Sequence, residues 1–267
     1  AYPYNDDIDV VAHRGESTYH IENTLEAIQT SIDQGIKVIE IDVVLTKDQE
    51  VVVFHDLTLE RLTGDDRRVS EVNLGEIQNL TITQGSLTST IPTLQEILDI
   101  TPSDVALLIE LKPDGDIFNQ LAALTEDLIS DNETHIIQSF SQPALEAIKE
   151  INSNRQCGFI MIIGEGGFVN YEFADFYTLE ESYIGRPLIN QIHTAGKLAY
   201  VWTINDEEKV TKCIALNADA IITDRALYFT NNLDVSEELV FYYRLQTLLM
   251  IDNTFINYEN LFVEIEE

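Results

Sequence analysis

The chain has 267 residues, enough for one large α/β domain or two small ones. Hydrophobic residues make up 45% of it, which excludes a disordered chain because a core of ordinary size can form. The 47 Asp and Glu residues against 15 Lys and Arg give a formal net charge of −32, so nucleic acid and anionic membrane surfaces are repelled as partners.

Short apolar runs alternate with amphipathic helical stretches along most of the chain. The apolar runs predict strands at 8–13, 38–45, 105–112, 135–139, 157–163, 173–179, 198–203 and 218–223. The stretches between them predict helices at 24–35, 93–100, 117–130, 142–151, 185–196 and 206–217. This alternation predicts an α/β fold of the TIM (β/α)8 barrel type, with an open doubly wound sheet as the alternative. The barrel is favoured because chemically active residues lie in or after several strands, whose C-terminal ends converge on one face of a barrel.

Two segments depart from the alternation. Residues 56–92 are polar and rich in turn residues, and we expect an insertion after the second barrel strand that forms a small lobe beside the active face. Residues 234–267 carry apolar residues at helical spacing, which predicts a helical extension packed on the barrel or on a second copy of the chain. We therefore expect a barrel domain at 1–232 and a C-terminal helical extension at 233–267, with a homo-oligomer left open.

The two cysteines and the chain start bear on cellular context. Cys157 and Cys213 show no metal-binding spacing, and we expect both to be buried free thiols. No segment reaches the roughly 18 apolar residues of a membrane span. The chain begins without an initiator Met or a signal peptide, which is typical of a processed protein or a fragment.

Carboxylates occupy alternate positions of two predicted strands. Glu40 and Asp42 lie two residues apart, so both side chains face the same side of their strand. Glu110 and Lys112 have the same spacing on the next barrel strand. Carboxylates that face one another repel unless a cation joins them, and hard oxygen ligands favour Mg²⁺ or Ca²⁺ over zinc. We expect Glu40, Asp42 and Glu110 to bind this divalent cation, with a buried ion pair to Lys112 as the structural alternative.

Two histidines end apolar runs near these carboxylates. His13 is followed by Arg14 and Gly15, a glycine that lets the backbone turn tightly beside a ligand. Arg14 can hold a phosphate with two parallel hydrogen bonds. His55 ends the run VVVFH, and a second imidazole beside a phosphate supplies the acid and base that phosphodiester chemistry needs.

Several further residues have secondary roles in this interpretation. Asn23 precedes the first predicted helix and is expected to cap it, while Glu22 or Asn23 contacts the metal or its ligands. Phe140 and Trp202 follow or end strands and are expected to pack on the substrate alcohol. Asp224 is expected to cap the last helix.

At this point the chain resembles the glycerophosphodiester phosphodiesterase family over residues 8–230. The shared motifs are HRG (13–15), ENT (22–24), EIDVVLTKD (40–48), VVFHD (52–56), LTG (62–64), IPTLQEIL (91–98), IELK (109–112), QSF (138–140), VWTIN (201–205) and ADAIITD (218–224). One departure is Ile21, where many members have Pro before ENT, and it concerns loop shape.

The resemblance implies an enzyme of lipid and glycerol metabolism that hydrolyses a glycerophosphodiester to glycerol 3-phosphate and an alcohol with a divalent cation, Mg²⁺ or Ca²⁺. By position, it implies that His13 and His55 are the catalytic pair. The metal ligands would be Glu40, Asp42 and Glu110, and the phosphate contacts Arg14 and Lys112. The substrate is then a small molecule. Some bacterial members carry this domain behind a membrane-spanning segment, so the chain fits either a cytoplasmic protein or the soluble catalytic part of a membrane-anchored one, with the tether outside this chain.

Two rival hypotheses remain at the level of sequence. The first is a phospholipase-like phosphodiesterase acting on lipid or polyglycerolphosphate substrates, and a lipid substrate would require an apolar rim for its acyl chains. The second is a non-catalytic binding or scaffold domain, which the presence of all the chemical residues disfavours.

Overall fold

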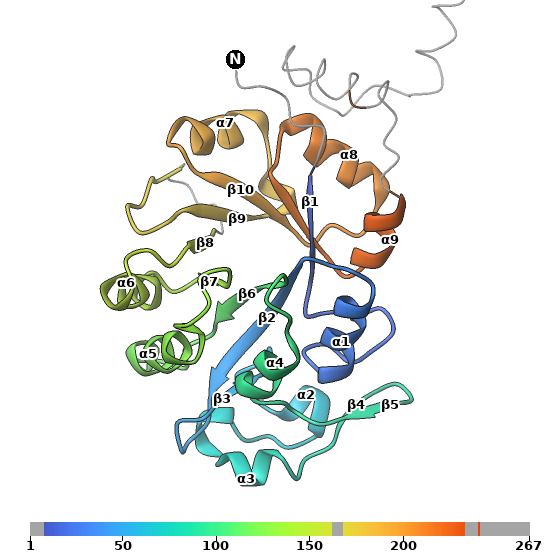
Figure 1. The fold of residues 1–267 in the computed structure, drawn as a ribbon, viewed down its shortest axis with the longest axis vertical. Coiled ribbons are helices and arrows are strands. Elements are labelled where there is room, and N and C mark those ends of the chain that lie inside the picture. Colours follow the sequence, from blue (N-terminus) through green and yellow to red (C-terminus); the bar gives the residue numbers. More distant parts are fainter. Residues whose placement is uncertain (1–7, 162–167, 233–239, 241–267) are drawn as a thin grey trace, which may run out of the picture.

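The computed structural model describes residues 8–161 and 168–232, together with Val240. Eight parallel strands surround one axis and the helices lie outside them (Figure 1). The barrel strands are β1 (Asp9–Ala12), β2 (Val38–Leu45), β6 (Ala106–Leu111), β7 (Ile136–Ser139), β8 (Cys157–Met161), β9 (Phe176–Glu180), β10 (Leu198–Trp202) and β11 (Ala220–Thr223). Strand β1 pairs in parallel with both β11 and β2, which closes the ring and confirms the predicted TIM barrel.

Six of the α-helices that follow the barrel strands match the predicted helices, and the helix at 226–232 was not among the predicted ranges. The helices are α1 (Leu25–Asp33), α4 (Leu94–Ile100), α5 (Phe118–Ile129), α6 (Gln142–Ile151), α7 (Arg186–Thr194), α8 (Glu207–Leu216) and α9 (Ala226–Asn232), with a short 3-10 turn η2 (Glu181–Tyr183) after β9. Within the described residues, no helix separates β8 from β9. In that same part of the chain, no helix has both the length and the apolar character to cross a bilayer.

The first helix begins one residue later than predicted. Thr24 is its N-cap, and the Thr24 hydroxyl accepts a hydrogen bond from the backbone N–H of Ala27. The prediction that Asn23 caps this helix is therefore wrong. Asn23 instead adopts a left-handed backbone conformation with φ of 60°, which asparagine tolerates, and its side chain turns toward β2.

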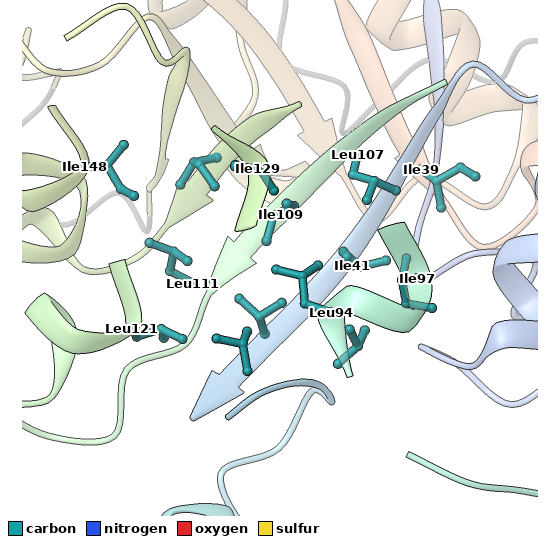
Figure 2. Packing of buried hydrophobic residues seen from close by; sticks show 14 of the residues in the cluster. Ile39, Ile41, Leu94, Ile97, Leu107, Ile109, Leu111, Leu121, Ile129 and Ile148 are labelled. Carbon is teal, nitrogen blue, oxygen red and sulfur yellow. The ribbon is translucent and has the colours of Figure 1, made fainter. Parts of the chain in front are cut away.

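Apolar side chains fill the layer between the barrel and the helices (Figure 2). Ile39 and Ile41 of β2 lie in this layer with Ile109 of β6, and each is fully buried. Burial of one such side chain stabilises the fold by about 1.5–3 kcal/mol. Since side chains alternate along a strand, the same packing turns Glu40 and Asp42 toward the barrel interior.

Aromatic packing closes the lower part of that interior. The Phe176 ring stacks on Tyr200 with centroids 4.6 Å apart, in a cluster with Leu108 and Ile222. Gly158 makes room for the ring, because a Cβ at that position would lie 2.0 Å from Phe176. These aromatic rings therefore form an apolar plug beneath the polar, C-terminal end of the barrel.

Residues 51–89 form a small lobe beside β2 (Figure 1). It contains β3 (Val51–Val53), which pairs antiparallel with β2, then α2 (Glu60–Thr63), η1 (Val69–Glu71), α3 (Leu74–Ile77) and the hairpin of β4 (Ile82–Gln84) and β5 (Leu87–Ser89). The lobe has its own hydrophobic cluster, to which Ile21 contributes. Its excursion from the barrel therefore starts at β3, a few residues before the predicted segment 56–92.

The predicted C-terminal extension 233–267 lies outside the described residues except for Val240, so the domain division at 232 stays a prediction. Both cysteines are buried free thiols, as expected.

Candidate active site

A pocket opens at the C-terminal end of the barrel. Eight of the nine site residues predicted from the sequence line it, and they are His13, Arg14, Glu40, His55, Glu110, Lys112, Phe140 and Trp202. The ninth, Asp42, lies beside Glu40 and Glu110. The fold therefore brings together residues that are up to 189 positions apart in the chain.

Three carboxylates converge at the centre of the site. Oxygens of Glu40, Asp42 and Glu110 all lie within 4.8 Å of one another, and Asp42 is the direct strand neighbour of Glu110. All three side chains are buried. Burial, reinforced by the charges of Asp42 and Glu110, raises the pKa of Glu40 well above its usual value. Burial and the charge of Asp42 likewise raise the pKa of Glu110 to about 7.

Two permanent cations lie against these carboxylates. Lys112 Nζ is 3.1 Å from Glu110 Oε1 and 3.5 Å from Asp42 Oδ1, while Arg14 Nε is 3.2 Å from Asp42 Oδ2. Burial alone would raise the pKa of Asp42, but the charges of Lys112 and Arg14 hold it below its usual value. Three carboxylates thus face two cations, so the group carries a net negative charge only when all three carboxylates are ionised, the form in which they could hold a metal ion.

A tight turn places Arg14 between the carboxylates. Arg14 has φ of 57° and Gly15 has φ of 79°, both in the left-handed region. A side chain on Gly15 would bring its Cβ within 2.8 Å of the Ala27 backbone, so only glycine fits this close approach. The turn aims the Arg14 backbone N–H at Glu40 Oε2, 3.0 Å away.

His13 is held by a residue from the far end of the chain. Its Nδ1 lies 2.6 Å from Asp224 Oδ1, and Asn205 Nδ2 donates to the other oxygen of Asp224 at 2.7 Å. Burial would raise the pKa of Asp224, but the hydrogen bond and charge interaction with His13 lower it. The sequence offered Asp224 only as a helix cap, because His13 and Asp224 are 211 positions apart.

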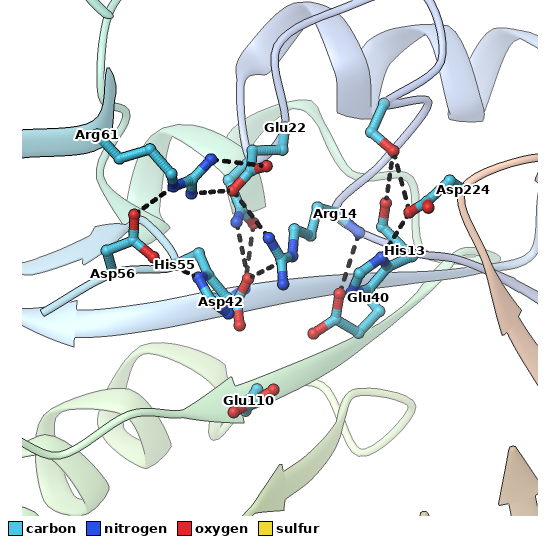
Figure 3. A network of polar contacts seen from close by, with 12 residues as sticks. His13, Arg14, Glu22, Glu40, Asp42, His55, Asp56, Arg61, Glu110 and Asp224 are labelled. Carbon is cyan, nitrogen blue, oxygen red and sulfur yellow. Dashed lines mark hydrogen bonds and ion pairs between the residues drawn. The ribbon is translucent and has the colours of Figure 1, made fainter. Parts of the chain in front are cut away.

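His55 has a carboxylate partner next to it in the chain. Its Nδ1 lies 2.6 Å from Asp56 Oδ1, as Figure 3 shows. Burial lowers the pKa of His55, and the charges of Lys112 and Arg14 lower it further against the opposing charge of Asp42. The two imidazoles therefore each have one nitrogen occupied by an aspartate and the other nitrogen left for chemistry in the pocket.

The ENT motif orients the charged groups. Asn23 Nδ2 donates to Asp42 Oδ2 at 2.8 Å, and the Asp42 backbone N–H donates to Asn23 Oδ1 at 3.1 Å. Glu22 Oε1 accepts from Arg14 at 2.9 Å. Asn23 thus fixes a carboxylate and Glu22 fixes the arginine, which is how supporting residues around a metal ligand usually act.

The other side of the pocket is more apolar. Phe140 and Trp202 pack edge to face with ring centroids 6.1 Å apart, and Ile160 and Ile222 lie nearby in the lining. Below them Thr178 donates to Gln138 Oε1 at 2.9 Å, and this buried polar pair was not predicted. One wall of the pocket is therefore charged and the opposite wall is aromatic.

Comparison with known proteins fits this geometry. The model of the glycerophosphoryl diester phosphodiesterase family matches residues 13–227, which includes every residue of this pocket and its partners. The chain belongs to this family. It is accordingly a hydrolase of phosphoric diesters.

Individual relatives align with this chain over most of its length. A glycerophosphodiester phosphodiesterase from Caldanaerobacter subterraneus is 29% identical over 229 residues, which span 80% of this chain and 93% of that protein. The structure of an Oleispira antarctica phosphodiesterase in complex with the product sn-glycerol-3-phosphate superposes with a TM-score of 0.75, at 26% identity, and covers 85% of this chain and 96% of that one. A glycerophosphodiester phosphodiesterase from Thermotoga maritima has a TM-score of 0.69 at 27% identity, with 84% and 98% coverage.

Proposed function

We propose that this chain hydrolyses glycerophosphodiesters to glycerol 3-phosphate and an alcohol with a divalent cation held by Glu40, Asp42 and Glu110. The observation that carries the proposal is the convergence of three buried carboxylates, two cations and two aspartate-held histidines on one pocket. The product found in the Oleispira antarctica relative supports glycerol 3-phosphate as the released group.

The donor set fits a hard divalent cation. The ligands are carboxylate oxygens only, and Asp42 Oδ1 is a buried atom without a hydrogen-bond partner in the described structure. Oxygen ligands of this kind suit Mg²⁺ or Ca²⁺. When bound, the cation would neutralise the phosphate and stabilise the charge that develops on it during transfer.

Arg14 and Lys112 would hold the phosphate. Both cationic side chains line the pocket, and Glu22 orients the Arg14 guanidinium from behind. An arginine fork holds two phosphate oxygens, whereas an ammonium acts as a point charge. Phe140 and Trp202 would pack on the alcohol or glycerol carbons at the opposite wall.

The two histidines would move the protons. His55 has a pKa lowered by burial, so it is largely neutral at pH 7 and suits a general base that takes a proton from the attacking hydroxyl or water. His13, which Asp224 holds in the pocket, would then be the general acid that protonates the leaving alcohol.

The first test is release of glycerol 3-phosphate from glycerophosphocholine and glycerophosphoglycerol, with and without EDTA. We expect turnover that EDTA abolishes and that Mg²⁺ or Ca²⁺ restores. Full turnover after exhaustive chelation would contradict the proposed metal dependence. Lysophosphatidylcholine in the same assay tests the phospholipase-like alternative.

A second test assigns the histidines. In a glycerophosphodiester that carries a p-nitrophenyl group, the p-nitrophenolate leaves without being protonated. His13→Ala should therefore lose much less activity on this substrate than on glycerophosphocholine. His55→Ala should lose activity on both substrates. The reverse pattern would exchange the two roles.

A further inference from the structure

The hydrogen bonds around His55 and Arg14 meet at one residue of the lobe. Arg61 lies on α2, and its guanidinium stands between Asp56 and Glu22 (Figure 3). Arg61 Nε donates to Asp56 Oδ2 at 2.5 Å, and its Nη2 donates to Glu22 Oε1 at 2.6 Å. One planar group thus binds two carboxylates that serve different parts of the site.

Each of these two carboxylates also contacts a residue with a proposed chemical role. Through its other oxygen, Asp56 is 2.6 Å from His55 Nδ1. Through the same oxygen that Arg61 contacts, Glu22 accepts from Arg14 at 2.9 Å. Arg61 does not line the pocket itself, so any effect it has on hydrolysis must pass through these two carboxylates.

We propose that Arg61 is a positioning residue that sets the orientation of His55 and Arg14 together and thereby makes the lobe part of the hydrolytic site. The inference rests on the proposed function, in which His55 moves a proton and Arg14 holds the phosphate. Its observation is independent of the metal, since Arg61 contacts neither Glu40 nor Glu110.

The geometry requires an arginine at this position. The planar guanidinium offers donors on two edges and can hold two carboxylates at once, whereas the ammonium of lysine is a single compact charge. Without the guanidinium, Asp56 and Glu22 face each other across the gap as two anions with one partner each. The aspartate is then free to rotate away from His55, and the glutamate to draw Arg14 out of the pocket.

The lobe offers a matched control in Arg67. Arg61 and Arg67 have the same side-chain exposure of 43%, and both bind two carboxylates. The partners of Arg67 are Asp65 and Glu76, neither of which contacts a residue of the pocket. A purely structural role for lobe arginines would therefore affect both positions alike.

The experiment compares Arg61→Ala, Arg61→Lys and Arg67→Ala with the unaltered protein, using glycerophosphocholine hydrolysis and inhibition by glycerol 3-phosphate. We expect Arg61→Ala to lower kcat roughly 100-fold, the scale of a small misplacement of catalytic groups, and to weaken inhibition by glycerol 3-phosphate. Arg61→Lys should recover part of one effect and not both. Arg67→Ala should keep kcat and KM within about twofold.

Two further measurements separate positioning from folding. Added guanidinium chloride at non-denaturing concentration should restore part of the kcat of Arg61→Ala and have no such effect on Arg67→Ala. Combining Arg61→Ala with Asp56→Asn should cost less kcat than the product of the two single losses, because Arg61 reaches His55 through Asp56, and the loss beyond that of Asp56→Asn alone measures the path through Glu22 and Arg14. Thermal melts identify any variant that is unfolded at the assay temperature, and if Arg61→Ala is one, the comparison of Arg61→Lys with Arg67→Lys decides.

The outcomes are distinct. If Arg61→Ala hydrolyses the substrate like Arg67→Ala, or if both lose activity in proportion to a loss of folded protein, the positioning role is overturned. If the unaltered protein and Arg67→Ala both release no glycerol 3-phosphate, the proposed function fails instead.

Discussion

The two ends of the barrel use buried charges in opposite ways. At the N-terminal end, Arg155 is fully buried and all of its N–H groups donate, two of them to Glu126 at 2.9 Å and the others to backbone carbonyls of residues 129, 132 and 135. At the C-terminal end, Arg14 Nε and Asp42 Oδ1 are buried and have ion-pair contacts of 3.2 Å and 3.5 Å, but no hydrogen-bond partner among the described residues. An ion network in which every N–H and oxygen has a hydrogen-bond partner holds structural elements together. A buried network with atoms that lack such partners can still bind a ligand.

The partners of the buried carboxylates make the same distinction. At the C-terminal end the site raises the pKa of Glu40 and Glu110, because burial and neighbouring carboxylates disfavour their charged forms. At the N-terminal end the buried carboxylate of Glu126 is matched by Arg155 and by Asn152 Nδ2 at 2.8 Å. The carboxylates of the first end repel one another, which a bound cation would relieve, whereas Glu126 at the second end already has its counter-charge.

The largest expected effect comes from breaking the satisfied network. Glu126→Gln would leave the Arg155 charge buried and place an NH₂ group against its donors, which we expect to cost about 3–5 kcal/mol of the free energy of unfolding. Urea denaturation measures this cost. Asp127→Asn, on the exposed face of the same helix, is the control and should change stability by less than about 0.5 kcal/mol. An equal effect in both variants would contradict the comparison.

The histidines of the C-terminal end should show the converse behaviour. His13→Ala and His55→Ala are each expected to lose at least ~100-fold in kcat on glycerophosphocholine. This loss corresponds to an activation free energy that is higher by about 2.7 kcal/mol. Far-UV circular dichroism and melting temperature should stay close to those of the unaltered protein, since both side chains border the pocket. Retained activity in a folded variant would remove that histidine from the mechanism.

Binding of the cation should stabilise the protein by a smaller amount. Mg²⁺ or Ca²⁺ at ten times its Kd should add about 1.4 kcal/mol to the free energy of unfolding. Glu40→Gln should lose this metal-dependent gain. In the metal-free protein this variant should be no less stable, because a carboxyl with a raised folded pKa is destabilised by ionisation above its usual pKa. A stability loss in metal-free Glu40→Gln would show that the cluster is structural.

The sequence was sufficient where side-chain chemistry followed strand periodicity. Glu40 with Asp42, and Glu110 with Lys112, could be placed on common faces because the runs around them are apolar and alternate regularly. His55 and Asp56 are neighbours in the chain, but their hydrogen bond was not predicted.

The remainder depended on long-range contacts that no local pattern encodes. Asp224 reaches His13 only because β11 closes the barrel against β1. Arg61 sits in a polar, turn-rich segment where a charged residue ordinarily points to solvent, and nothing in its neighbours indicated two active-site carboxylates. The cap assignment of Asn23 failed because Thr24, the next residue, is equally suited to capping.

The smallest expected effect concerns His135 at the N-terminal end. Its Nδ1 accepts from the backbone N–H of Leu107, and burial with the nearby Arg155 charge lowers its pKa from 6.5 to about 4. The unfolded chain therefore binds more protons between these values, and stability is lost as pH falls through that window. We expect a loss of about 1 kcal/mol from this group between pH 6.5 and 5.5.

Urea denaturation at several pH values measures this contribution. His135→Asn, which keeps a hydrogen-bond acceptor but does not titrate, should have a correspondingly flatter dependence over the same range. An unchanged slope would show that His135 is already protonated in the folded protein or is more open to water.

The aromatic plug formed by Phe176 and Tyr200 has a consequence for the traffic of molecules. It fills the barrel interior beneath the pocket, so we expect molecules to reach the site from the C-terminal end of the barrel only. Substrate and both products then share one mouth. The alcohol and glycerol 3-phosphate must leave by the route that the next substrate takes, so accumulated product competes directly with the incoming diester for the same space.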